Sequence, residues 1–195
     1  MIPESTPPHT CAIAFKEWAG VCDALADGRQ SLILRKGGIA EDAGEFRPEH
    51  PSFWLYPTHL HEAQQGLRDT RAPAAKPLPS GMLELPALAL VECMTWVDHP
   101  DMLDAISDLH VWTSETVLKR FEYRRPGLWV LGVRVLRADP PPRIVMTQEQ
   151  SGCKSWVPLD EPVGTHKLIP TLDDTTLNQR MARIRALQES DGGAF

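Results

Sequence analysis

The chain has 195 residues, of which 42% are hydrophobic and 24% charged, and its formal net charge is −6. This composition is typical of a soluble globular protein with one domain, and it excludes collagen, coiled coil and disorder as descriptions of the whole chain. No run of about 20 apolar residues is present, and the N-terminus lacks the basic and apolar regions of a secretory signal. We therefore expect a cytoplasmic protein without a membrane span.

In the first half of the chain, apolar spacing and the positions of glycine and proline predict the elements. Gly28 is placed to end a helix, Pro57 to stop a strand, and Thr58 to cap a second helix. The predicted elements are a disordered tail over 1–11, a helix over 13–27, a strand over 31–35, a strand over 53–56 and a helix over 58–68.

The second half opens with a proline-rich loop and ends with an amphipathic helix. The predicted elements are a loop over 69–80, one or two strands over 83–96 interrupted at Pro86, helices over 100–109 and 114–123, a strand over 128–136, short strands over 144–146 and 155–157, and a helix over 173–189.

These elements do not alternate regularly between strand and helix, which argues against a doubly wound parallel sheet. The predicted fold class is α+β, with a small mixed β-barrel or a strongly curved sheet and peripheral helices. We expect a single domain over 12–165, followed by the amphipathic helix and a tail over 166–195.

A cluster of histidines and carboxylates follows the second predicted strand. His59, His61 and Glu62 are candidate catalytic residues, with Glu49 or His50 beside them, and His59 and His61 are candidate metal ligands. Histidine and carboxylate together can bind a divalent metal and activate water. The alternative is a polar junction whose histidines bond to the backbone. Whether the protein is an enzyme stays open, because no phosphate-loop, dinucleotide-binding, hydrolase-elbow or HExxH motif is present.

A basic segment lies at 119–143. It holds seven basic and two acidic residues, a net charge of +5 that leaves −11 on the other 170 residues. Arginine suits phosphate contact and base stacking, and aromatic residues lie within or near the segment. The alternative is a solvated basic face that pairs with the acidic remainder. The candidate nucleic-acid contacts are Arg35, Lys36, Arg120, Arg124 and Arg134 for phosphates, and Trp112 and Tyr123 for stacking.

Most of residues 12–160 resembles an uncharacterised bacterial family. The resemblance is carried by the segments AFKEWAGVCDALADGRQSLILRKGGIAE, FWLYPTHLHE, LHVWTSETVLKRFEYR and GCKSWVPL, which are similar to the family's LKEWA-type helix, LLRKGGI strand–turn and FxLYPTxxHQ segment. Glu62 stands where that family usually has glutamine. The family has no established activity. Its occasional association with restriction-endonuclease-like domains implies a role in restriction–modification or defence, with an effector nuclease as a partner.

A second resemblance concerns the fold. The spacing Gly28-x-Gln30-x-x-Ile33-x-Arg35 is similar to the G-x-K-x-x-E-x-R signature of ASCH domains, which are PUA-like. Gln30 and Ile33 replace the lysine and glutamate of that signature, so the resemblance implies the fold and not the pocket chemistry. PUA-like domains bind RNA or modified bases in DNA, although function does not follow from fold alone.

Three functions are therefore open. The preferred one is a module that binds DNA or RNA, including modified bases. Seven basic residues in one short segment are the feature that differs most from the rest of this acidic chain. The second is a metal-dependent nuclease or hydrolase that uses His59, His61 and Glu62. The third is a protein-interaction scaffold, which six tryptophans would permit. The deciding observation is whether the 119–143 charges and the Arg35–Lys36 turn share one face.

Overall fold

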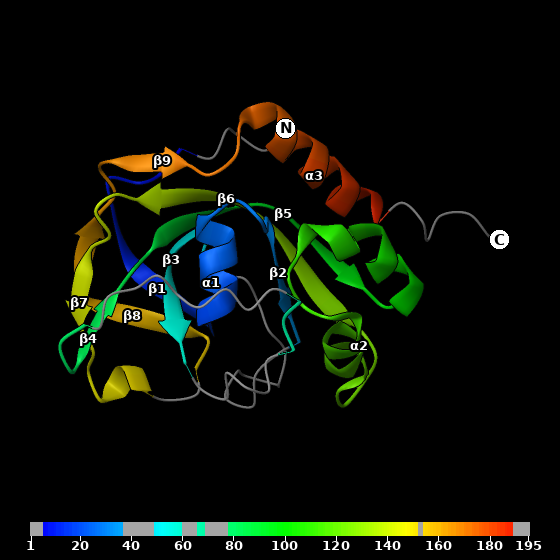
Figure 1. Ribbon diagram of the computed structural model, residues 1–195, viewed down its shortest axis with the longest axis horizontal. Coiled ribbons are helices and arrows are strands. Elements are labelled where there is room, and N and C mark those ends of the chain that lie inside the picture. The colour runs from blue at the N-terminus through cyan, green and yellow to red at the C-terminus, as the bar shows by residue number, and fades with distance from the viewer. Residues whose placement is uncertain (1–5, 37–48, 60–65, 69–77, 152–153, 189–195) are drawn as a thin grey trace.

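The computed structural model describes residues 6–36, 49–59, 66–68, 78–151 and 154–188. They form a mixed α+β fold in which a curved sheet surrounds α1 and carries α3 across it (Figure 1). The strands are β1 (Thr10–Trp18), β2 (Leu32–Arg35), β3 (Ser52–Thr58), β4 (Met82–Glu84), β5 (Ala87–Val97), β6 (Leu128–Ala138), β7 (Arg143–Val145), β8 (Trp156–Gly164) and β9 (Leu168–Pro170). The helices are α1 (Ala19–Ala26), η3 (Pro100–Leu109), α2 (Ser114–Glu122), η4 (Glu149–Ser151) and α3 (Asp174–Ala186).

The main sheet has the strand order β2-β6-β5-β3-β1-β8, and β9 pairs with β6. The pair of β1 and β3 is parallel, whereas the other pairs are antiparallel. The carboxyl ends of β1 and β3 therefore meet at one edge of the sheet, where α1 begins. A small second sheet joins β4 to β7.

The sheet curls strongly. Three strands separate β2 from β1 in the sheet order, which would place them about 19 Å apart in a flat sheet. Arg35 Nη2 of β2 nevertheless donates to the Lys16 carbonyl oxygen of β1 at 2.6 Å. The expectation of a strongly curved sheet agrees with this contact. A closed barrel is not found, since no pairing among the described strands joins β2 to β8.

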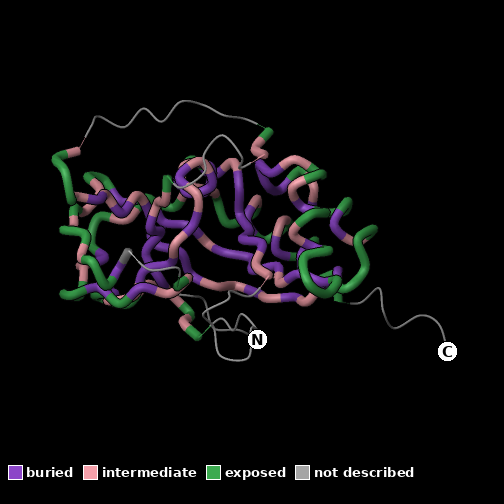
Figure 2. Tube along the Cα trace, turned by 90° about the horizontal axis from the view of Figure 1, so that it is seen from below, coloured by how far each residue is buried: buried purple, intermediate pink, exposed green. Residues whose placement is uncertain are grey.

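Buried residues run through the middle of the molecule (Figure 2). They form two clusters, because strand side chains alternate between the two faces of the sheet. Phe53 and Leu55 of β3 join the cluster that includes the helices, whereas Trp54 and Tyr56 join the cluster beside β8 and β4. Gly132 of β6 allows α3 to pack closely. A Cβ at that position would lie 2.6 Å from Met181 Sδ.

The predicted helix over 13–27 is wrong in its first half. β1 occupies Thr10–Trp18, and only Ala19–Ala26 is helical. β3 on one side and β8 on the other supply hydrogen bonds to this segment, and that pairing overrides the helical spacing of its apolar residues. β1 also begins inside the segment expected to be a disordered tail, since Thr10 and Cys11 belong to it.

Thr58, which was expected to begin a helix, is the last residue of β3. β3 runs through Pro57 to Thr58, and the Thr58 hydroxyl donates to the Glu17 carbonyl oxygen at 3.0 Å. Of the predicted helix over 58–68, residues 60–65 lie outside the described residues. The part that follows is not helical, because Gly66 has φ +55° and Leu67 forms a bridge with Trp112.

Other predictions hold. The 83–96 segment is two strands, β4 and β5, separated at Pro86. α2, β6 and α3 lie where they were predicted, and the Asp173 side chain caps α3 by accepting from Thr176 N. The predicted helix over 100–109 is a 3₁₀ helix, and β9 was not predicted. No described helix is both long and apolar enough to span a membrane.

Candidate nucleic-acid interface

Arg120 of α2 packs against the junction of β1 and α1. Its guanidinium carbon lies 4.2 Å from the centre of the Trp18 ring and 5.0 Å from that of Trp112. Its Nη1 also donates to the Leu34 carbonyl oxygen at 3.4 Å. Burial lowers the pKa of Arg120, and the Glu17 carboxylate opposes that shift. Arg120 therefore serves as a half-buried structural cation between two indole rings.

Glu17 is the acidic member of this junction, and no sequence pattern pointed to it. Its side chain is 2% exposed, and Oε1 accepts a hydrogen bond from Trp18 N at 2.9 Å. Arg35 lies nearby with its guanidinium carbon 4.4 Å from the centre of the Phe15 ring. Within the described part of the chain, Glu17 Oε2 and Arg35 Nε have no hydrogen-bond partner. The junction therefore combines buried charge with aromatic stacking.

Lys36 fixes the turn that follows α2. Its ammonium group donates to the carbonyl oxygens of Phe121 at 2.6 Å and Gly127 at 2.7 Å, and to that of Arg125. Burial and the nearby Arg125 guanidinium lower the pKa of Lys36. Carbonyls at a helix C-terminus favour a cation. The Lys36 ammonium group is thus bound by backbone carbonyls of the protein, and its role is to hold the turn after α2 in place.

That turn and two neighbouring strands display arginines next to aromatic rings. The Arg124 guanidinium lies 5.3 Å from the centre of the Tyr123 ring, and Tyr123 is 50% exposed. The Arg125 guanidinium lies 5.9 Å from Trp96, which packs edge-on against Trp129 at 5.2 Å. We call these five residues the α2-end surface.

Gly127 brings the turn close to the tryptophans. Its φ is +126°, and a Cβ there would lie 2.1 Å from Trp96 Cζ2. No side chain larger than hydrogen fits at this position without moving the ring. The backbone of the turn therefore lies directly on Trp96.

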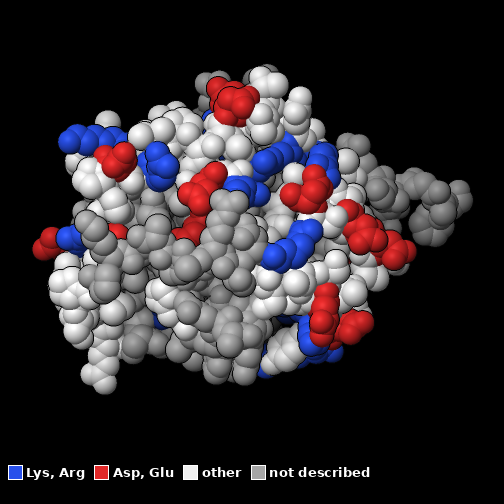
Figure 3. Space-filling view, in the orientation of Figure 1, with Lys and Arg blue, Asp and Glu red and all other residues white. Residues whose placement is uncertain are grey.

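The other predicted contacts lie elsewhere or face inward. Trp112 is fully buried, so it is no open stacking platform. Arg134 pairs with Glu92 at 2.8 Å and Asp174 at 2.6 Å, and Arg143 pairs with Glu84 at 2.9 Å. On the face in Figure 3, the coloured basic and acidic side chains are intermixed. The charged side chains of 119–143 thus do not form one surface. Of the predicted nucleic-acid contacts, only Tyr123 and Arg124 lie on the α2-end surface.

The histidine cluster is only partly described. His61 and Glu62 lie outside the described residues, and His59 is an exposed residue just after β3. The ring of His50 packs edge-on against that of Trp156, with the ring centres 5.0 Å apart. Among the described residues, no group of three or more His, Cys, Asp or Glu side chains could hold a metal ion.

Comparison with known proteins places the chain in a family. A family model described as a domain of unknown function, DUF1802, matches residues 14–183. The chain belongs to this family. No curated protein matches it.

Among solved structures, the DUF1802 chain is similar to ASCH from Zymomonas mobilis, with 10% identity and a TM-score of 0.42 over 87% of this chain and 92% of that one. A serine-to-alanine mutant of that protein gives 11% identity and the same TM-score over 91% and 99%. At this level of similarity the function of ASCH does not carry over to the DUF1802 chain.

Of the α2-end surface, Trp96 was missed in the sequence, whereas Trp129 was noted as a possible stacking ring of the basic segment but was not assigned a contact. Trp96 and Trp129 are 33 positions apart and meet because they are register partners in the β5–β6 pair. Arg125 was counted in the basic segment but not assigned a contact. The adjacent Tyr123-Arg124-Arg125 run was the one signal in the sequence that pointed to this surface.

Proposed function

We propose that this DUF1802 protein binds single-stranded nucleic acid, DNA or RNA, at the α2-end surface. The observation that carries the proposal is the meeting of exposed Tyr123 with Arg124, Arg125 and the Trp96–Trp129 pair. Unpaired bases stack on aromatic rings and on guanidinium planes, whereas the arginines attract the phosphates between them. A duplex hides its base faces, so a stacking surface favours single strands.

The surface is held in place before any ligand arrives. Lys36 ties three carbonyl oxygens of the turn together, and Arg120 anchors the helix that leads into it. Preorganisation lowers the conformational entropy that binding must remove. The proposal therefore needs no rearrangement of the described backbone.

The charge of the surface is local and modest. Residues 115–127 hold four basic and two acidic side chains, within a chain of net charge −6. A local field can attract a polyanion to an acidic protein. With two or three phosphates contacted, log affinity should fall against log salt with a slope of about −1.5 to −2.

The test is fluorescence anisotropy with labelled oligo-dT and oligo-rU of about 12 nucleotides over a range of salt. The double variant Arg124→Ala, Arg125→Ala and the single variant Tyr123→Ala should each weaken binding about tenfold, as loss of one stacked base predicts. Arg143→Ala removes a similar charge from the distant β4–β7 sheet and is the matched control. Absence of binding at low salt, or equal loss in the control, would contradict the proposal.

The resemblance to a family associated with restriction-endonuclease-like domains supports a place in restriction–modification or defence. In that role the protein holds a nucleic-acid strand for an effector nuclease. Competition binding between modified and unmodified oligonucleotides tests whether the protein recognises modified bases. The module itself should leave a labelled strand intact in Mg²⁺. Cleavage that disappears in His59→Ala would instead support the metal-dependent hydrolase.

A further inference from the structure

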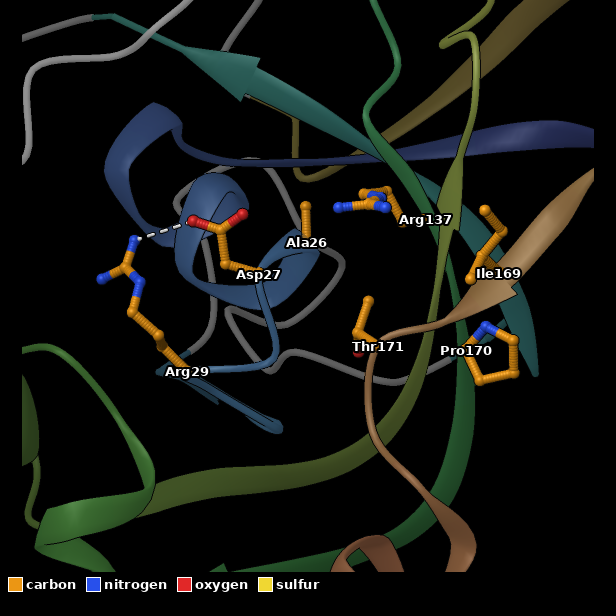
Figure 4. Close-up of a pocket in the computed structure, with 7 residues that line it drawn as sticks. All are labelled: Ala26, Asp27, Arg29, Arg137, Ile169, Pro170 and Thr171. Atoms are coloured by element: carbon orange, nitrogen blue, oxygen red, sulfur yellow. Dashed lines mark hydrogen bonds and ion pairs between the residues drawn. The ribbon is translucent and has the colours of Figure 1, made fainter.

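A pocket of about 500 Å³ lies between the end of α1, β6 and β9 (Figure 4). Its size is in the range that holds a small metabolite. Arg137 lines it and lies eight positions after Trp129 on β6, a distance of about 27 Å along an extended strand. The pocket is therefore separate from the α2-end surface.

The frame of the pocket is tightly packed. Gly28 follows α1 with φ +72°, and a Cβ there would lie 2.6 Å from the Thr171 carbonyl oxygen. Arg180 Nη1 donates to the Gly28 carbonyl oxygen at 3.0 Å. Thr171 is held in turn, because its N and its Oγ1 both donate to the Val135 carbonyl oxygen at 3.1 Å. The α1–β2 connection and the β9–α3 connection thus form one fixed wall.

Two guanidinium groups and one carboxylate line the pocket. The Arg137 side chain is exposed and makes no hydrogen bond or ion pair within the described residues, and Figure 4 shows it pointing toward Ala26 at the end of α1. Arg29 Nη2 is 3.5 Å from Asp27 Oδ2. Three carbonyl oxygens of the last turn of α1, those of residues 23–25, already accept hydrogen bonds from Asp27 N, Gln30 N and Gly28 N. The charge that faces the pocket is therefore positive.

We propose that this pocket binds a nucleoside monophosphate. Arg137 takes the phosphate group, since guanidinium binds phosphate oxygens in a two-pronged geometry. Asp27 accepts hydrogen bonds from the ribose hydroxyls, which gives the one carboxylate in the lining a role. Ile169 and Pro170 give the base an apolar surface, and Ile169 is 45% exposed.

Isothermal titration calorimetry tests this with adenosine monophosphate, inorganic phosphate and adenosine as separate probes. Arg137→Ala should weaken binding of the monophosphate at least tenfold, the scale of one charge-assisted contact. Asp27→Ala should weaken binding of the monophosphate relative to that of inorganic phosphate, because it removes the acceptor for the ribose hydroxyls, whereas loss of a negative charge does not weaken phosphate binding. Arg143→Ala should change binding of neither the monophosphate nor inorganic phosphate. The double variant Arg124→Ala, Arg125→Ala should bind the monophosphate with the same affinity as the parent protein.

The unfolding transition of each variant is recorded first, since Arg137 and Asp27 are surface side chains whose removal should leave the fold intact. Equal affinity for inorganic phosphate and the monophosphate would overturn the nucleoside assignment. A 5′-phosphorylated oligonucleotide that binds more tightly than the monophosphate, and depends on Arg137, would overturn the free nucleotide as the ligand. Unchanged binding in Arg137→Ala would overturn the site.

Discussion

At the scale of single residues, Arg120 shows why a count of charges does not locate a binding surface. In the sequence it is one of seven cations in 119–143, yet its guanidinium lies between two indole rings and donates to a strand carbonyl. A cation over an aromatic ring stabilises by about 1–2 kcal/mol when it is partly desolvated. Lys119, its neighbour in sequence, is exposed and pairs with Glu115 on the same helix.

Replacing Arg120 with alanine should lower the free energy of unfolding by about 2–3 kcal/mol, because two stacking contacts and a hydrogen bond are lost. Arg120→Lys should recover part of this, since it keeps the charge but not the planar group. Urea denaturation measures both. Lys119→Ala is the control, with an expected loss below about 0.5 kcal/mol. A loss in Arg120→Ala no larger than the control's would show that the stacking is not stabilising.

His110 makes stability depend on pH. It is 5% exposed, its Nδ1 lies 3.2 Å from Arg68 Nη2, and burial together with the Arg68 charge lowers its pKa from 6.5 to about 4. Between those values the unfolded chain binds a proton that the folded chain does not. The free energy of unfolding should therefore fall as pH decreases from 6.5 to 4, by roughly 3 kcal/mol in total.

Denaturant unfolding from pH 7.5 to pH 4 measures this loss. In His110→Asn the side chain cannot be protonated, so the dependence should flatten over that range although the variant is less stable at pH 7. The ion pair of Asp108 with Arg183 acts in a different window, because the arginine lowers the pKa of Asp108 to about 2. Stability from that pair is lost only below about pH 4. A parent protein with no loss between pH 6.5 and pH 4 would contradict the role of His110.

At the scale of elements, the α1–β2 connection is fixed by Gly28. Gly28→Ala should lower the free energy of unfolding by about 2–4 kcal/mol, because the positive φ is strained and the new Cβ would strike the Thr171 backbone. Gly81→Ala is a matched control, since Gly81 has φ +81° with nothing within 4 Å of an added Cβ. It should lose only about 1 kcal/mol. Equal losses in the two variants would mean that the contact with Thr171 is not limiting.

Elements whose partners are local were predictable from the sequence. α2 and α3 carry their own caps at Thr113 and Asp173, and β6 is a long apolar run. β1 was not predictable, because its conformation is decided by β3 and β8, which lie more than 30 residues away in sequence. The residues of the candidate interface likewise fall into a part that the sequence predicts and a part that it does not. Tyr123 and Arg124 are adjacent in the chain, whereas the Lys36 contacts and the Trp96–Trp129 pair depend on tertiary structure.

At the scale of the whole molecule, α3 belongs to the same core as the sheet. Three of its apolar side chains, Leu177, Met181 and Ile184, are buried in the cluster that contains β5 and β6, and Leu187 at its C-terminal cap is the fourth. Arg183 binds Asp108 of η3, and Arg134 of β6 binds Asp174. Core packing and ion pairs therefore join α3, which lies in the segment expected over 166–195, to the domain expected over 12–165.

We therefore expect one cooperative unfolding transition for the whole chain. Burial of four such side chains stabilises by about 6–12 kcal/mol, which is comparable to the total stability of a domain of this size, about 5–15 kcal/mol. A chain that ends at Leu172 should thus lack a cooperative urea transition and show little near-ultraviolet circular dichroism. A chain that ends at Gln188 keeps α3 and should unfold as the parent does. A cooperative transition at the parent's midpoint in the shorter chain would show instead that the sheet folds without α3.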